Sequence, residues 1–330
     1  MGLDTTLLRV PMHQVDAFAR STSGRFTGNP AAVVLLPKGC SWPDDATLVA
    51  IAGENNLSET AYVLEPPPTG DAAEDGGGVW RLRWFTPTTE VDLCGHATLA
   101  TAHIIFTRVP DMISATKIAF ETRSGRLFVE RSVSGGDGEY CMTFPSSRIA
   151  DEIDADVKTA LIDALGSSGE VLQGGADAMV VLPSWRAVAN AEPDMAALSA
   201  VLDSNGLRGL IATAACDGDE ACDGEAGLDF VSRFFAPNIG VPEDPATGSA
   251  HCALAPFWAS RRAMRSGDAG CARDGGTVRL RSKQLSRRGG YFQLEVGRSQ
   301  SGKDITKLTG SVADYLDGII DLEVASASLN

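Results

Sequence analysis

The feature that most constrains the fold is a pattern that occurs twice along the chain. Residues 84–87 (WFTP) precede the triplet Gly95-His96-Ala97, and residues 234–237 (FFAP) precede the triplet Gly248-Ser249-Ala250. In each copy an aromatic run with strand character ends at a proline, and a polar loop leads to a glycine-polar-alanine triplet that opens a segment rich in small and apolar residues. The repetition predicts two related halves, each with a helix that begins at its triplet.

The length of the chain supports the same division. Its 330 residues exceed the size at which one hydrophobic core usually suffices, so two domains are expected. We predict an N-terminal half-domain over residues 1–128 and a C-terminal half-domain over residues 129–330. The pairing of the C-terminal segment 312–330, which could return to the first half-domain, is left open by the sequence.

The charge of the chain limits its partners. A formal net charge of -15 and a pI near 4.7 argue against nucleic acid and anionic membranes, because both require clustered Lys and Arg. No segment reaches the roughly 18 apolar residues of a membrane span, and the N-terminus lacks the basic and apolar regions of a secretory signal. The sequence therefore predicts a cytoplasmic protein that binds any anionic substrate locally, through backbone N–H groups at helix starts.

Cysteine usage and motifs limit the chemistry further. The seven cysteines are scattered without a C-x-x-C pair, which predicts reduced thiols instead of a disulfide framework or structural zinc. The chain also lacks a glycine-rich phosphate loop, a G-x-G-x-x-G dinucleotide motif and an H-E-x-x-H zinc motif. We therefore expect no metal and no cofactor.

The two predicted helix starts are candidate ligand sites. A helix start leaves several N–H groups unpaired and carries partial positive charge, so it can hold a carboxylate or stabilise an enolate-like charge. Gly95 and Gly248 would let a ligand approach the backbone closely. The alternative is a pair of ordinary glycine-initiated helices packed on a sheet, and the duplication of the pattern favours the ligand site.

Two side chains near the first helix start could carry chemistry. Glu59 heads an otherwise apolar strand, where a buried carboxyl group would suit accepting and returning a proton near neutral pH. His96 follows Gly95, where the helix dipole would favour a neutral imidazole that donates a hydrogen bond. The alternatives are an exposed glutamate at a strand end and a structural histidine.

Two further residues lie next to the predicted helix starts. Cys94 directly precedes Gly95 and could be a thiol of low pKa at a helix N-terminus. Asp244 lies in the loop before the second helix, where it could bind an amine or a hydroxyl group or could simply cap the helix.

Several blocks of the sequence resemble one protein family. VDAFA, GNPAAVV, NLSETAYV, TPTTEVDLCGHATLATA and EDPATGSAHCAL occur between about residues 15 and 254, in the order expected of the phenazine-biosynthesis PhzF-like family. SKQLSRRGGYFQLEV followed by LTGSV resembles the family's C-terminal portion. The chain is therefore identified from its sequence as a PhzF-like isomerase with the diaminopimelate epimerase fold.

This resemblance implies an α+β fold and a site. The fold would be two pseudo-symmetric domains, each a curved, mostly antiparallel, barrel-like β-sheet wrapped around a central helix, with the active site between the central helices and a homodimer as the assembly. Glu59 would be the acid/base carboxylate. The substrate, a small carboxylated metabolite, would be bound by the remaining matching positions, which are Cys94, Gly95, His96, Asp244, Gly248 and Ser249.

The resemblance leaves three functions open. Epimerases of this fold use two opposed cysteines, but here the position that corresponds to Cys94 in the second half is Pro245 or Ala246, which disfavours a two-thiol racemase. The favoured function is a cofactor-independent isomerase in which Glu59 moves a proton from one atom of the substrate to another. The alternatives are an epimerase or racemase that uses Cys94 with a carboxylate, and a non-catalytic or regulatory binding protein.

Overall fold

The chain forms two compact units. The computed structural model describes residues 5–21, 25–66, 78–132, 138–147, 149–150, 153–216, 221–266 and 276–325. Unit 1 comprises Met1–Met142 and Gly310–Asn330, and unit 2 comprises Thr143–Thr309. Two strands run from one unit into the other, namely β8 (Glu139–Pro145) and β16 (Asp304–Ala325).

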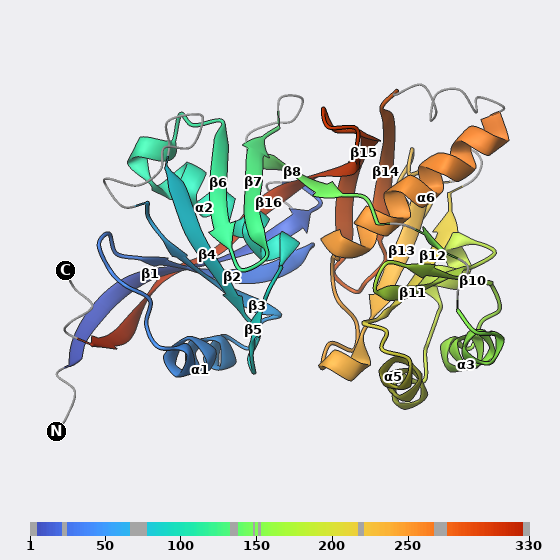
Figure 1. The fold of residues 1–330 in the computed structure, drawn as a ribbon, viewed down its shortest axis with the longest axis horizontal. Coiled ribbons are helices and arrows are strands. Elements are labelled where there is room, and N and C mark those ends of the chain that lie inside the picture. The colour runs from blue at the N-terminus through green and yellow to red at the C-terminus, as the bar shows by residue number, and fades with distance from the viewer. Residues whose placement is uncertain are drawn as a thin grey trace. The chain divides into compact units, whose positions relative to one another are not determined.

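Unit 1 is a sheet that closes on itself. Its strands follow the order β1, β2, β3, β4, β6, β7, β8, β16, and β16 pairs in turn with β1 (Figure 1). The pairs β2–β3 and β4–β6 are parallel, while the other pairs with a defined register are antiparallel. Its remaining elements are β1 (Thr5–Ala19), β2 (Asn29–Leu36), α1 (Asp45–Asn55), β3 (Glu59–Leu64), β4 (Val79–Phe85), β5 (Glu90–Val91), α2 (Gly95–Arg108), the 3-10 turn η1 (Pro110–Met112), β6 (Lys117–Thr122) and β7 (Gly125–Arg131).

Helix α2 is the core of unit 1. Every residue from His96 to Phe106 is buried, so the helix has no solvent-exposed face along this stretch. A helix that is buried all round needs small side chains where it approaches strands, and alanines and threonines fill its first two turns. The predicted first helix start is therefore correct, because α2 begins at Gly95.

Hydrogen bonding assigns two segments near the unit boundary to unit 1. The predicted boundary between residues 128 and 129 falls within β7, and β7 pairs with both β6 and β8. The C-terminal part of β16, from Ser311 onward, pairs antiparallel with β1 along nearly the whole length of that strand. Both pairings stay within the closed sheet.

Unit 2 has a second mixed sheet. Its order is β16, β15, β14, β13, β12, β11, β10, β9, with β11–β12 and β13–β14 parallel. The sheet and its helices comprise β9 (Ile149–Ala150), α3 (Ala155–Leu165), β10 (Glu170–Gly174), β11 (Asp177–Val181), α4 (Trp185–Ala189), α5 (Met195–Ser204), β12 (Leu210–Ala215), β13 (Phe230–Phe235), the 3-10 turn η2 (Pro237–Ile239), α6 (Gly248–Ser266), β14 (Val278–Gln284) and β15 (Gly290–Arg298).

The two faces of this sheet are covered by different helices. One face packs on α3, α4 and α5 through leucine-rich contacts that include Leu161, Val188 and Leu198. The other face packs on α6, where the indole N–H of Trp258 donates to Oγ1 of Thr213 on β12 at 3.0 Å. Helix α6 begins at Gly248, as predicted. The two units together confirm the predicted α+β fold with a mostly antiparallel sheet around a central helix.

The helices of the described part of the chain include none that is long and apolar enough to cross a membrane. Helix α6 is 19 residues long, but arginines occupy its C-terminal half.

One prediction about the cysteines is wrong. Cys216 and Cys222 form a disulfide, with their Cα atoms 6.0 Å apart. Cys216 follows the end of β12, and Cys222 pairs with Glu225 in an isolated antiparallel bridge. Cys40, Cys94, Cys141 and Cys252 are free, as predicted, and Cys271 lies outside the described residues.

Candidate functional site

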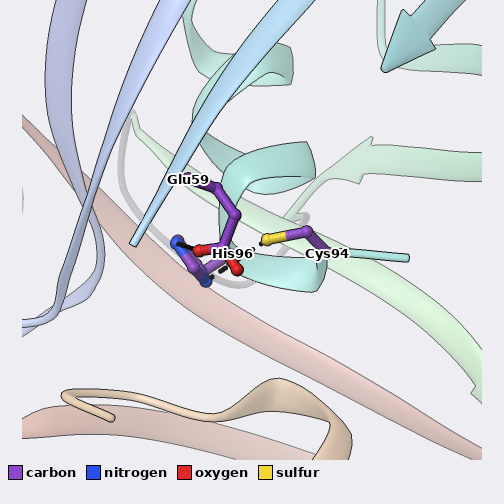
Figure 2. Close-up of side chains that lie close together, drawn as sticks. All are labelled: Glu59, Cys94 and His96. Carbon is purple, nitrogen blue, oxygen red and sulfur yellow. Dashed lines mark hydrogen bonds and ion pairs between the residues drawn. The ribbon is translucent and has the colours of Figure 1, made fainter. Parts of the chain in front are cut away.

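The structure brings Glu59, Cys94 and His96 together inside unit 1. Figure 2 shows the carboxylate of Glu59 and the thiol of Cys94 both directed at the ring of His96. Nε2 of His96 lies 3.2 Å from Oε2 of Glu59, and Nδ1 of His96 lies 3.5 Å from Sγ of Cys94. The cluster forms because β3 begins at Glu59 and α2 begins at Gly95, and both starts lie at the same end of unit 1.

The contact between Glu59 and His96 is close but poorly aligned. The Glu59 side chain is 18% exposed and the His96 side chain 8% exposed. Oε2 and Nε2 are both buried, and neither has a well-aligned hydrogen bond within the described residues. Two buried polar atoms without a satisfied hydrogen bond are costly unless another group binds to them, which is typical of a ligand site.

Asn29 holds the other side of the His96 ring, and the sequence analysis missed it. Nδ2 of Asn29 lies 3.2 Å from Nδ1 of His96, and Asn29 is fully buried at the start of β2. The preceding Gly28 has φ of 75°, and a Cβ there would lie 2.3 Å from the carbonyl oxygen of Ala17. The sequence signal for Asn29 was the Gly-Asn-Pro turn at residues 28–30. Only glycine fits at its first position, because the backbone of Gly28 lies so close to Ala17.

The imidazole of His96 does not behave as the helix dipole alone predicts. Burial lowers its pKa, but the negative charges that Cys94 and Glu59 can carry act against burial and prevail, so the pKa lies well above its ordinary value. The direction of this shift runs against the neutral imidazole that the helix dipole predicts. The largest raising cause is the charge that Cys94 can carry, followed by the carboxylate of Glu59 at 3.2 Å.

Cys94 is not an activated thiol. It is 6% exposed, and burial raises the pKa of its thiol, with the nearby carboxylate of Glu59 acting in the same direction. The prediction of a low-pKa thiol is thus wrong, because desolvation at this position exceeds the effect of the helix N-terminus and of His96. This weakens the epimerase alternative, which needs a thiolate.

The same three residues have the donor types of a metal site. Their ligand atoms all lie within 4.8 Å of one another, and a Cys-His-Glu set would suit zinc. However, the two ring nitrogens of His96 already contact a carboxylate on one side and an amide and a thiol on the other. An ion would have to displace these contacts and deprotonate a thiol whose pKa burial raises. The geometry therefore favours proton chemistry over metal binding.

In unit 2 the structure places Asp244, Gly248 and Ser249 at the start of α6. The backbone N–H of Asp244 donates to the carbonyl oxygen of Phe234 at 3.0 Å, which attaches the loop to the end of β13. Oγ1 of Thr247 donates to the carboxylate of Asp244 and so orients it. Asp244 is half-buried, Gly248 is buried and Ser249 is half-buried.

Gln284 is a second residue that the sequence analysis missed. This fully buried side chain at the end of β14 accepts a hydrogen bond from the N–H of Thr247 at 2.9 Å and donates to the carbonyl oxygen of Asp244 at 2.6 Å. It also donates to Oγ1 of Thr247 at 3.1 Å. Gln284 therefore fixes both the backbone and the side chains of the loop that opens α6.

The first backbone N–H groups of α2 and α6 have no hydrogen-bond acceptor within the described residues. In the parts of the chain that the structure describes, no hydrogen bond satisfies the backbone N–H of Gly95 or His96 in unit 1, nor that of Gly248 or Ser249 in unit 2. Unpaired N–H groups at a helix start attract an anionic group. Each unit therefore has a helix start with unpaired N–H groups and a carboxylate side chain, Glu59 in unit 1 and Asp244 in unit 2.

Comparison with known proteins identifies the family. The family described as "Phenazine biosynthesis-like protein" (PhzC-PhzF) matches residues 15–318. The chain belongs to this family. It is 40% identical to an uncharacterized isomerase of Pseudomonas aeruginosa over 96% of this chain and 100% of that protein. It is 33% identical to a mouse phenazine biosynthesis-like domain-containing protein, over 95% of this chain and 99% of that protein.

Solved structures agree with this assignment. A PhzF-family protein from Enterococcus faecalis superposes with a TM-score of 0.73 at 32% identity, over 95% of this chain and 99% of that chain. A hydroxyproline epimerase from Agrobacterium vitis, at 12% identity and a TM-score of 0.53, shares the fold. Two further bacterial relatives, 39% and 40% identical, are also named isomerases, and these names confirm the prediction that the chain is an isomerase.

Proposed function

We propose that this protein is a cofactor-independent isomerase that moves a proton within a small carboxylated metabolite, with Glu59 as the acid/base group. The observation that carries the proposal is the buried contact between Oε2 of Glu59 and Nε2 of His96, which lies beside the unpaired N–H groups of α2. A carboxylate at such a place can take a proton from a carbon atom, and the helix start can stabilise the negative charge that develops.

The residues suggest a sequence of steps. The carboxylate of Glu59 takes a proton from a carbon next to a carbonyl or carboxyl group. The electron pair of the broken C–H bond forms a C=C bond, and the π pair of the C=O bond moves onto its oxygen. The N–H groups of Gly95 and His96 donate to the developing oxyanion. Glu59, now protonated, returns the proton to a different atom of the same molecule, so the overall change is an isomerisation or tautomerisation.

His96 acts on Glu59 in this scheme. Its raised pKa favours a positive charge next to the carboxylate, and burial of the ring at the start of α2 fixes its orientation. His96 would thus set the direction of the Glu59 side chain before the substrate binds.

The family resemblance implies that the start of α6 in unit 2 also binds a substrate group. The N–H groups of Gly248 and Ser249 would hold a carboxylate, and Asp244 would accept a hydrogen bond from an amino or hydroxyl group of the substrate. The homodimer and the cytoplasmic location remain predictions from the sequence.

The test begins with a library of carboxylated metabolites, each assayed for its effect on the melting temperature. A ligand that binds only the folded state must raise it. Product analysis by NMR then separates the functions: a changed position of a double bond or proton supports the isomerase, whereas inversion at one carbon supports an epimerase. If no library member raises the melting temperature, the enzymatic proposal loses its support.

Variants of the two candidate groups complete the test. Glu59→Gln should abolish turnover while leaving ligand binding intact, because the amide keeps the shape of the side chain but cannot accept the proton. Cys94→Ala should retain turnover. The opposite pattern would replace the isomerase with the one-thiol epimerase.

A further inference from the structure

A buried carboxylate in unit 2 holds an arginine that no step above uses. Asp177, at the start of β11, is 2% exposed and pairs with Arg208, whose side chain is 38% exposed. Nε of Arg208 donates to one carboxylate oxygen of Asp177 at 2.8 Å, and Nη2 donates to the other. Two parallel hydrogen bonds of this kind fix the plane of the guanidinium group.

The sheet register places this arginine on the α6 face. Ile211 pairs with both Met179 and Phe234, so the three side chains point to the same face, and Asp177, two residues before Met179, shares it. A Cβ at Gly174, the partner of Asp177 on β10, would lie 3.2 Å from Cβ of Ala253, so Gly174 faces α6. Asp177 and its arginine therefore lie on the side of the sheet that α6 covers.

The same register places Arg208 at the end of the sheet where α6 begins. The guanidinium carbon of Arg208 lies 5.4 Å from the ring centroid of Phe234. Phe234 also accepts, through its carbonyl oxygen, the hydrogen bond from the N–H of Asp244. Arg208 and the loop that opens α6 are therefore attached to the same residue of β13.

Electrostatics agree with this placement. Burial lowers the pKa of Arg208, but Asp177 and then Asp244 raise it, with a net rise. Burial raises the pKa of Cys252, one turn into α6, to about 12, and the charge of Arg208 opposes that rise. The guanidinium charge thus reaches both Asp244 and the first turn of α6.

Arg208 has one edge left for a second anion. Its Nε–Nη2 edge binds Asp177, and in the described residues no hydrogen bond occupies Nη1. The Nη1–Nη2 edge of a guanidinium matches the two oxygens of a planar carboxylate. A carboxylate ligand at the start of α6 would also be repelled by Asp244, and a cation beside that residue removes this obstacle.

We propose that Arg208 is a specificity-determining residue that binds a carboxylate group of the substrate through its Nη1–Nη2 edge, with Asp177 as the group that positions it. The inference rests on the proposed function for the identity of the ligand, but it concerns binding in unit 2 alone. It requires that the substrate present a planar carboxylate to this unit. A neutral amide of the same shape would bind poorly there.

The experiment uses benzoate as the carboxylate probe and benzamide as its neutral counterpart, titrated into the full-length protein by calorimetry and by NMR of the arginine Nε–H signals. Benzoate should bind more tightly than benzamide and should shift the Arg208 signal. Arg208→Gln should weaken benzoate binding by about tenfold or more, as expected for the loss of a charge-assisted bidentate pair. The same substitution should leave benzamide binding unchanged.

Three variants make the result specific. Arg208→Lys keeps the charge but not the planar edge and should fall between wild type and Arg208→Gln. Arg279→Gln removes an exposed arginine that pairs with Glu295 on the same unit and should have no effect. Because Arg208→Gln leaves Asp177 buried without its partner, Asp177→Asn/Arg208→Gln gives a second measurement that removes both charges together.

The outcomes separate this inference from the proposed function. Equal benzoate binding by wild type, Arg208→Gln and the double variant would overturn the inference about Arg208. An Arg208 Nε–H signal that does not shift on addition of benzoate would also overturn it. Benzoate has no proton to transfer, so Glu59→Gln should bind it as wild type does. Failure of the Glu59 proposal would therefore leave the Arg208 result intact, and the reverse also holds.

Discussion

Gln284→Leu tests whether the loop that opens α6 is held as the structure indicates. Leucine has a similar size to glutamine but can neither accept from the N–H of Thr247 nor donate to the carbonyl oxygen of Asp244. Three hydrogen bonds are lost, at 2.9, 2.6 and 3.1 Å in the native protein. The N–H of Thr247 is left buried without an acceptor.

The expected loss of stability follows from these contacts. A neutral hydrogen bond contributes about 1 kcal/mol, and an unsatisfied buried donor costs about 1–3 kcal/mol, so the free energy of unfolding should fall by about 2–4 kcal/mol. For a folding unit of 150 to 250 residues, a loss of this size corresponds to a drop in melting temperature of roughly 5–15 °C. Calorimetry on the purified variant would measure it.

Gln293→Leu is the matched control. It introduces the same substitution at an exposed position of the neighbouring strand β15, where the free energy of unfolding should change by no more than about 0.5 kcal/mol. If Gln284→Leu melted within the range of this control, Gln284 would not hold the loop. The position of the Asp244 loop would then have to be explained by contacts other than those of Gln284.

Four further predictions concern His96 and the cysteines. The NMR titration of the His96 ring should have its midpoint above the usual value of about 6.5, and Glu59→Gln should lower it; a native midpoint at or below the usual value would contradict the charge that we assign to His96. Because the pKa of His96 is higher in the folded than in the unfolded protein, protonation of His96 stabilises the fold at pH values below the unfolded pKa. This stabilisation is lost as the pH rises through the folded pKa, so the stability advantage of wild type over Glu59→Gln should vanish in alkaline solution. Cys94 should resist iodoacetamide in the folded protein at pH 8, since burial raises its pKa, and rapid labelling would show that it is accessible. Reduction of the Cys216–Cys222 disulfide should lower the free energy of unfolding by about 2 kcal/mol, as chain entropy implies for so short a loop, and unchanged urea midpoints would refute this.

The sequence was most informative where local pattern determines structure. The repeated triplets predicted the starts of α2 and α6, because a glycine after a polar loop and before a run of small residues is a local signal. Glu59 could be recognised as the head of β3 for the same reason. The family resemblance then supplied the fold in which these elements lie.

The sequence was least informative where distant residues meet. Asn29 reaches His96 across 67 positions and Gln284 reaches Thr247 across 37, and neither contact can be read without the strand register. The protonation of His96 and Cys94 was misjudged because a helix dipole is visible in the sequence, whereas the neighbours that outweigh it are not. The disulfide was missed because the approach of two cysteines in space cannot be read from their spacing along the chain.

Solvent-deuterium exchange tests the central claim most directly. A ligand found by thermal shift would be incubated in deuterated water with wild type, Glu59→Gln and Cys94→Ala, and deuterium incorporation at carbon would be followed by NMR. If Glu59 transfers the proton, exchange should fall by about a hundredfold or more in Glu59→Gln, the range expected for loss of a general base, while Cys94→Ala stays close to wild type. Undiminished exchange in Glu59→Gln with the ligand still bound would contradict the account.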